Sequence, residues 1–320
     1  MLTARSPRHC VAGQRHARFA GAVALALMLL AGCASTPELS ARARQALPEQ
    51  ALLERIPFHG QRDYQCGPAS LAMVLNASGV GVTVDTLIPQ VFLPEREGSV
   101  QPEMLASVRR HRRIPFVLEG TFDALLSEIG AGHPVVVMQN LSLPAWPVWH
   151  YAVAIGFDRQ AEQLILHSGM TPRQRTDFAR FDATWARSNR WAFVALPPGE
   201  LPATLSPQDA LTAIADFERV QGTRAALPAW EALARRYPHH AMGQFALGNA
   251  YHDADAPQQA MRAFNRAVQA DPTLGVAWLN LGLLRQAQGQ HAAARRALRA
   301  AAELEGPWQA QAQLALDAHR

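Results

Sequence analysis

The last third of the chain repeats with a period of 34 residues, and this period constrains the fold more than any other feature of the sequence. A block that begins at Ala241 places small and large residues at fixed offsets and closes with a proline. The same offsets recur from Gly275, and a block from Pro207 keeps some of them. A repeat of this length indicates stacked helix pairs that bury their apolar faces against their neighbours. The recurring residues are Leu247, Gly248, Tyr251, Ala260, Phe264, Ala267 and Pro272, then Trp278, Leu281, Gly282, Arg285, Ala294, Leu298, Ala301 and Pro307.

These offsets resemble the tetratricopeptide repeat, which has small residues where two helices cross and a proline at the end of the pair. The resemblance implies an all-α domain over residues 207–320, with repeats at about 207–240, 241–274 and 275–308 and a capping helix from Trp308 onward. Three repeats are about the minimum for a stable stack. We expect a protein partner or the substrate to bind the concave groove of such a stack. A proline-rich linker, residues 198–206, precedes it.

Residues 1–32 have the features of a secretory signal peptide: an arginine-rich start, an apolar run from Phe19 to Leu30, and small residues before Cys33. The apolar run is too short to span a bilayer, which takes about 20 residues. The stretch around Cys33 resembles the bacterial lipoprotein box, which implies that this cysteine is lipidated and becomes the new N-terminus. We therefore expect residues 33–55 to be the lipidated cysteine and a tether. Since Ala34 follows it rather than an aspartate, the resemblance favours the outer membrane, facing the periplasm.

The charge of the chain gives no reason to expect nucleic acid as a partner. The formal net charge is +4, but four of the 30 basic residues and no acidic residue precede Cys33. The remaining 26 basic residues balance 26 acidic ones. A neutral mature protein has no excess charge with which to bind a phosphate backbone.

Residues 56–197 predict one α+β domain, because β-branched and aromatic runs bounded by turn residues alternate with amphipathic stretches. Several of the predicted strands follow one another without a helix between them, which indicates an antiparallel sheet. The predicted helices begin at Cys66, Ser99 and Thr121. The predicted strands are IPFVLE, PVVVMQN, HYAVAIGF, QLILHS and WAFVAL.

Cys66 is the one thiol left once Cys10 departs with the signal peptide and Cys33 carries lipid. An unpaired thiol is a liability in an oxidising compartment, so a chain that keeps one usually has a use for it. The motif CGP before an apolar run places Cys66 at a helix N-terminus, where the free N–H groups and the helix dipole favour a thiolate. Cys66 is therefore a candidate nucleophile.

His150 is the candidate base among twelve histidines, because it opens the strand HYAVAIGF. Small residues share its face of the strand, and we expect the helix of Cys66 to pack closely there. A histidine at a strand start is more often structural, so the assignment of His150 as the base depends on the other motifs found with it.

The motif QRDYQCGPASLAMVL, followed 84 residues after its cysteine by HYAVAIGFD, resembles the papain-superfamily cysteine peptidases of family thirty-nine. The resemblance implies a papain-like domain in which the helix carrying Cys66 packs on an antiparallel sheet. It also implies that Gln61 donates a side-chain N–H to the oxyanion, with Gln65 as a weaker candidate because it points away from the nucleophile. Gln61 lies five residues before Cys66, where relatives usually show six.

The aspartate that orients the histidine in that family is missing. His167 and Ser168 stand where it would be expected, and a hairpin that returns near Arg159 brings His167 beside His150. His167 is our favoured orienting residue, and Asn140 at the end of PVVVMQN is the alternative. Asp158 lies at the turn, roughly 25 Å from His150 at about 3.3 Å per residue, which is too far.

The sequence thus predicts a cysteine peptidase that acts on a peptide or protein substrate, without a cofactor. The sequence has one remaining thiol and scattered histidines, with no CxxC motif and no HxxxH-type pair, so we expect no metal site. The main alternative is an inactive adaptor that binds peptide while the repeats assemble an envelope complex. A cell-wall peptide amidase would use the same thiol chemistry.

Overall fold

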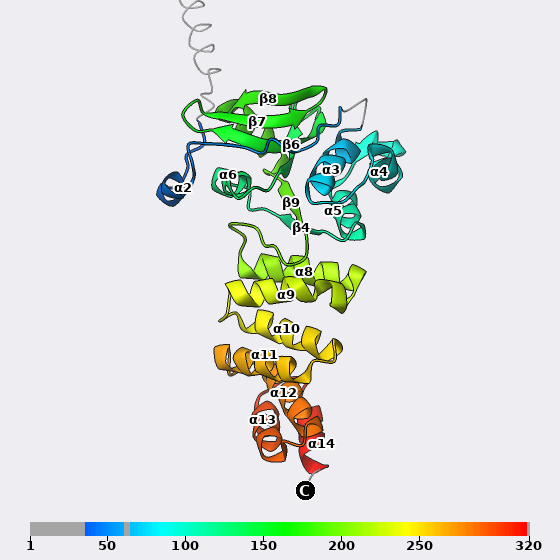
Figure 1. Ribbon diagram of the computed structural model, residues 1–320, viewed down its shortest axis with the longest axis vertical. Coiled ribbons are helices and arrows are strands. Elements are labelled where there is room, and N and C mark those ends of the chain that lie inside the picture. Colours follow the sequence, from blue (N-terminus) through cyan, green and yellow to red (C-terminus); the bar gives the residue numbers. More distant parts are fainter. Residues whose placement is uncertain (1–35, 61–64, 319–320) are drawn as a thin grey trace, which may run out of the picture. The chain divides into compact units, whose positions relative to one another are not determined.

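The computed structural model describes residues 36–60 and 65–318. Its first domain contains an antiparallel sheet with the strand order β4-β9-β5-β6-β7-β8 (Figure 1), and β1 pairs with the far end of β6. All the pairings described for this sheet are antiparallel, which confirms the predicted α+β class. The strands are β1 (Gln50–Leu52), β4 (Ile114–Val117), β5 (Val135–Asn140), β6 (Trp149–Asp158), β7 (Gln163–Ser168), β8 (Thr171–Asp177) and β9 (Ala192–Leu196), beside a small pair β2 (Phe92–Leu93) and β3 (Gly98–Ser99).

Helices cover both faces of this sheet. The core cluster that contains α3 and α4 packs against one face of β6, and the cluster that contains α6 and α7 packs against the other (Figure 1). The helices of this domain are α2 (Ala41–Ala46), α3 (Cys66–Ala77), α4 (Val84–Val91), α5 (Gln101–Arg110), α6 (Phe122–Gly130) and α7 (Phe178–Trp185), with short 3-10 turns at Pro94–Arg96 and Ala186–Ser188. The sequence pattern missed α4 and α7.

The side-chain alternation along β6 corrects one expectation. Tyr151, Val153 and Ile155 pack in the cluster of α3, whereas Ala152 and Ala154 pack in the cluster of α6. The helix of Cys66 therefore does not lie on the small-residue face that begins at His150. The physical reason is apolar area: the larger side chains bury more surface against the apolar helix α3, which is buried from its second to its tenth residue.

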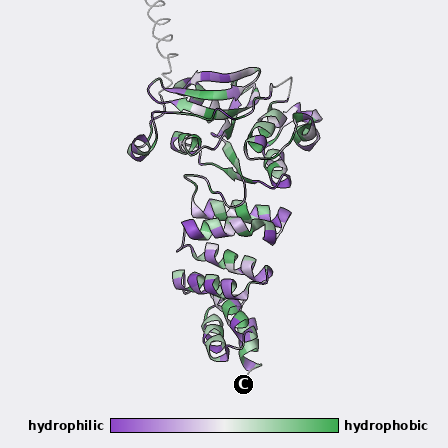
Figure 2. Cartoon of the chain, viewed as in Figure 1, coloured by the Kyte–Doolittle hydropathy of each residue, from purple (hydrophilic) through white to green (hydrophobic). Residues whose placement is uncertain are grey.

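The domain begins before the boundary expected at residue 56. β1 adds to the sheet opposite the end of β6, and Arg159 donates to the carbonyl of Leu47 at 2.7 Å. α2 is capped by Ser40, whose backbone N–H also reaches the carboxylate of Asp123. The later part of the expected tether is thus folded onto the domain. β8 was also missed, because its sequence TPRQRTD is polar and lies at the exposed edge (Figure 2).

The second region is all-helical and confirms the repeat architecture. Gly248 faces the ring of Phe264, and a Cβ on Gly282 would lie 2.7 Å from Cγ of Leu298, so two of the helix pairs, α10–α11 and α12–α13, each cross at a glycine. Polar and apolar residues alternate along these helices in Figure 2. The helices are α8 (Pro207–Gln221), α9 (Thr223–Arg236), α10 (Ala241–Asp253), α11 (Pro257–Ala270), α12 (Gly275–Ala287), α13 (His291–Glu303) and α14 (Gln309–Asp317) (Figure 1).

The proline-rich linker is bound to both regions rather than free. The buried carboxylate of Glu128 accepts the backbone N–H of Ala203 at 2.7 Å, and Tyr237 donates to the carbonyl of Leu205 at 2.7 Å. α8 continues the apolar core of the sheet through Ile214 and Phe217.

The expected signal peptide and Cys33 lie outside the described residues. Between Thr36 and Ala318, and leaving aside residues 61–64, no helix combines the length and apolarity needed to cross a bilayer.

Candidate active site

Cys66 is the first residue of α3 and is half-buried. The helix begins here because Pro68 occupies its first turn, where a missing N–H costs nothing, and an apolar run follows. Burial raises the pKa of the Cys66 thiol, and backbone N–H groups of Tyr151, Gly67 and Cys66 lower it without cancelling that effect. At neutral pH the sulfur is therefore protonated at rest. We expected a resting thiolate, and desolvation outweighs the helix N-terminus.

Because Gly67 has no side chain, α3 can pack closely against the segment that contains Ser99. A Cβ at this position would collide with the side chain of Ser99, whose hydroxyl is buried without a hydrogen-bond partner among the described residues. The wall beside the nucleophile therefore holds an unsatisfied O–H group.

His150 is the second residue of β6, at the end of the strand that faces the cavity of Cys66. Its Nε2 lies 2.9 Å from the hydroxyl of Ser168. This bond leaves Nδ1 as the ring nitrogen available for chemistry. Burial lowers the pKa of His150, so its imidazole is neutral at pH 7. Within the described ranges, no hydrogen bond joins Cys66 to His150.

The structure does not bring His167 to His150. His167 stands opposite Val153 in the hairpin, three residues further along β6, and a bulge between Ala154 and Gly156 shifts the register. Its Nδ1 accepts the backbone N–H of Arg173 at 3.1 Å, and its Nε2 lies 3.3 Å from the carbonyl of Ile56. The residue that reaches His150 is the next one, Ser168, from the end of β7.

Asn140 has a different role from the orienting one that we considered. It stands opposite Trp149, and its Oδ1 accepts the backbone N–H groups of Ser142 and Val148, each at 3.0 Å. It therefore fixes the loop between β5 and β6. Gln61 lies outside the described residues. Gln65 is the N-cap residue of α3 and makes no side-chain cap bond.

Cys66 and His150 line the same cavity, of about 860 Å³. This volume lies within the range of sites that bind small molecules or short peptides, about 300–1,000 Å³. The remaining walls come from the β2–β3 segment, the start of α5, β5, the loop before β6, the start of β6 and the β7–β8 turn: Arg96, Glu97, Gly98, Ser99, Val100, Gln101, Pro102, Met138, Pro147, Val148, Trp149, Tyr151 and Gly169.

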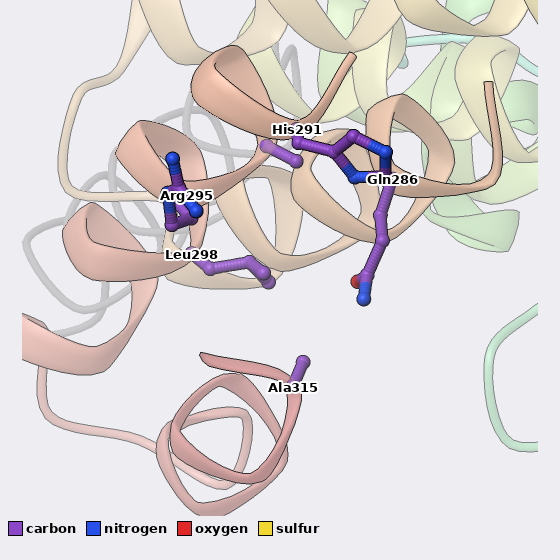
Figure 3. Close-up of a pocket in the computed structure, with 6 residues that line it drawn as sticks. Gln286, His291, Arg295, Leu298 and Ala315 are labelled. Carbon is purple, nitrogen blue, oxygen red and sulfur yellow. The ribbon is translucent and has the colours of Figure 1, made fainter. Parts of the chain in front are cut away.

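A second cavity lies among α12, α13 and α14 of the repeats (Figure 3). Gln286, His291 and Arg295 are its polar side chains, and Leu298 and Ala315 are among its apolar ones. Its volume is about 220 Å³, below the usual range for a ligand site. The Cys66 cavity is therefore the stronger candidate for chemistry.

Sequence reasoning paired the correct hairpin with His150 but missed Ser168 as its contact. The signal was present, because Ser168 follows His167 directly in the stretch where the family resemblance leads us to expect an aspartate. A serine there is read as a loss, whereas its hydroxyl can still hold an imidazole through one hydrogen bond.

Comparison with known proteins agrees with both regions. Residues 53–193 match the Peptidase_C39 like family, and residues 243–274 and 276–306 match the tetratricopeptide repeat. Among solved structures, the chain is similar to a protein from Bacillus anthracis described as a C39-like peptidase, with 17% identity, a TM-score of 0.39, and coverage of 47% of this chain and 98% of that one.

The repeat region is similar to the TPR2B domain of yeast Sti1 in its pHsp70 complex, with 20% identity, a TM-score of 0.32, and coverage of 35% of this chain and 93% of that one. It is also similar to MamA, with 20% identity and a TM-score of 0.32. That match covers 35% of this chain and 64% of MamA, less than two thirds of its length. No curated protein matches the chain significantly. Residues 53–193 thus match the C39-like peptidase family, and the region that follows them matches the tetratricopeptide repeat.

Proposed function

We propose that this protein is a cysteine peptidase in which Cys66 is the nucleophile and His150 carries the proton. The observation that supports this most strongly is that both side chains line one cavity, although 84 residues separate them in the sequence. The family of the domain agrees with the proposal. A thiol and an imidazole in one cavity are the minimum set for acyl transfer.

The pKa shifts favour general-base attack from a neutral pair. As the sulfur of Cys66 bonds to the substrate carbonyl carbon, its proton passes to Nδ1 of His150 and the carbonyl oxygen takes up the negative charge. The imidazolium then protonates the departing amine, which leaves a thioester on Cys66. Water attacks the thioester, gives a proton to His150, and the carboxyl product departs as the thiol is restored. Catalytic hydrogen bonds commonly form only when substrate binds. We therefore expect the thiol of Cys66 and the imidazole of His150 to approach each other in the complex with substrate.

Ser168 and the oxyanion donors complete the proposed site. Ser168 holds Nε2 of His150, which directs Nδ1 to the cavity. The backbone N–H of Cys66 and, by family resemblance, the side chain of Gln61 would bind the oxyanion.

We further propose that the protein works at the periplasmic face of the outer membrane, held by lipid on Cys33. The repeats would recruit a protein partner or the substrate, because tetratricopeptide repeats present a surface for other proteins. The motif around Cys33 supports the first proposal, and the described repeat helices support the second.

Comparison of the peptides released from an envelope extract by the protein and by Cys66→Ala tests the activity. We expect mass spectrometry to find products only with intact Cys66, and His150→Ala to slow their release by about 10²–10⁴-fold, the usual contribution of a general base. Muropeptides as the only products would indicate the amidase. Identical product sets with and without Cys66 would leave the peptidase without support.

A specific observation favours a second candidate, the inactive peptide-binding adaptor. The side chain that contacts Nε2 of His150 is the uncharged hydroxyl of Ser168, so among the described residues no carboxylate is seen to stabilise an imidazolium at this position. Carbamidomethylation of Cys66 by iodoacetamide separates the two. We expect labelling to rise with pH and to be slower in His150→Ala, whereas equal rates in both proteins would support the adaptor.

A further inference from the structure

Exposed apolar side chains gather beside the Cys66 cavity. Trp146 is 74% exposed and Trp149 is 50% exposed, which is unusual for the residue type with the largest apolar surface. We call the following six residues the apolar rim: Leu141, Leu143, Trp146, Val148, Trp149 and Met170. The first five belong to the loop between β5 and β6 and the start of β6, and Met170 lies in the turn between β7 and β8.

Hydrogen bonds hold the loop of the apolar rim in one shape. Asn140 accepts two of its backbone N–H groups, and the backbone N–H of Leu141 donates to the carbonyl of Val148 at 2.9 Å. Arg187 donates to the carbonyl of Ser142 at 2.8 Å and to that of Asn140 at 3.3 Å. A loop fixed in this way loses little conformational entropy when a ligand covers it.

The apolar rim is continuous with the cavity of the nucleophile. Val148 and Trp149 line that cavity together with Cys66 and His150, and Gly169 next to Met170 lines it too. The lining of the cavity also includes the polar residues Arg96, Glu97 and Gln101. A ligand that reaches Cys66 from the rim would therefore lay one side along apolar surface.

We propose that the apolar rim is the surface that binds large apolar side chains of a peptide whose backbone enters the Cys66 cavity. Substrates would then be peptides or unfolded protein segments with Leu-, Phe- or Met-type residues close to the attacked bond. This assignment rests on the proposed function only for the cleavage step, because binding requires no active thiol. Aromatic side chains that become buried in a complex are among the groups that contribute most to such binding.

A peptide fits the apolar rim better than a lipid bilayer does. Part of the rim is cavity wall, so a bilayer placed on it would cover the entrance to Cys66. A peptide would bury the same side chains, and its own backbone could enter the cavity and reach Cys66.

Binding to the full-length Cys66→Ala protein tests the assignment. The probe is a fluorescein-labelled peptide of serine and glycine with two adjacent leucines, and the comparison peptide has serines in their place. We expect fluorescence anisotropy to show binding of the leucine peptide only. Trp146→Ser and Trp149→Ser should each weaken it about tenfold, since truncated hot-spot aromatics cost about 1.4 kcal/mol or more.

Leu314→Ser is the matched control, because Leu314 is 72% exposed and lies in α14, away from the cavity lining. It should leave binding unchanged, and circular dichroism checks that all three variants remain folded. Equal binding of both peptides, or unchanged binding in both tryptophan variants, would overturn the assignment.

Sedimentation with vesicles of phosphatidylethanolamine and phosphatidylglycerol tests whether the apolar rim binds a lipid bilayer instead of a peptide. Vesicle binding that Trp146→Ser removes, without selective binding of the leucine peptide, would assign the rim to the membrane instead. Selective binding of the leucine peptide without any hydrolysis by the intact protein would refute the proposed peptidase and leave the rim assignment standing.

Discussion

The two regions of this protein are determined by residues at very different sequence distances. In the repeats, Gly248 contacts Phe264 in the adjoining helix, so one helix pair carries the information for its own packing. In the peptidase-like domain, Cys66 is bound by a backbone N–H of β6, and His150 is bound by Ser168 of β7. A local sequence pattern is thus enough to determine a helix pair, whereas the active site depends on the register between elements that are distant in the sequence.

The strongest test of the local rule is Gly248→Val in α10. The new side chain would collide with the ring of Phe264, and overpacking of this kind typically costs about 1–3 kcal/mol. We expect urea unfolding, followed by circular dichroism, to show a loss of that size.

Ala292→Val is the matched control for that substitution, because Ala292 is exposed on α13. It should cost only the difference in helix propensity, at most about 0.7 kcal/mol. Iodoacetamide labelling of Cys66 should be unchanged in both variants. If labelling changed in Gly248→Val alone, the two regions would not be independently determined.

The same contrast explains which parts of the structure the sequence could predict. The repeat blocks were predicted closely: α8, α10 and α12 begin at Pro207, Ala241 and Gly275, where the three blocks were expected to begin. The prediction was possible because each offset reports a contact within the same or the next helix. The strands β4, β5, β6, β7 and β9 were found because their runs are apolar and buried. β8 was missed because an exposed edge strand has no apolar face to reveal it.

The site was predicted less completely, for a physical reason. The position of Cys66 follows from its own helix, but the partner of His150 depends on a bulge in the β6–β7 register. One residue of uncertainty separates His167 from Ser168, and a change of one residue points the side chain to the other face of the sheet. The pKa of the Cys66 thiol was also out of reach, because burial by distant elements decides it.

Ser168→Asp tests how the group that contacts His150 controls the reactivity of Cys66. A carboxylate in place of a hydroxyl 2.9 Å from Nε2 would stabilise the imidazolium and raise the pKa of His150. The resulting thiolate–imidazolium pair should speed carbamidomethylation of Cys66 at pH 7 about tenfold, which corresponds to about 1.4 kcal/mol. Ser168→Ala should not reproduce this gain. A matching gain in both variants would show that access, not charge, limits the thiol.

The pH dependence of stability gives an independent reading of the same variant. In the native protein the pKa of His150 is lowered by burial, so its contribution to stability is present at high pH and is lost as pH falls below about 6.5, the ordinary histidine pKa. When the Ser168→Asp substitution supplies a carboxylate as charge partner, the folded pKa of His150 is raised and the sign reverses. The free energy of unfolding of this variant, relative to the native protein, should therefore rise as pH falls from 8 to 5.5.

The smallest expected effect concerns the contact between the two regions. It tests whether apolar burial or a charged pair joins them. Arg109 of α5 contacts the carboxylate of Asp216 in α8 at 3.0 Å, while Gln221 donates to the carbonyl of Arg109 at 2.8 Å. Both charged side chains remain partly in water, so we expect Arg109→Gln and Asp216→Asn to show a coupling of less than about 1 kcal/mol in a double-mutant cycle of urea unfolding. The apolar residues Ile214 and Phe217 would still join α8 to the core of the sheet. A coupling well above that value would mean that one charged pair, rather than shared apolar burial, unites a locally determined region with a non-locally determined one.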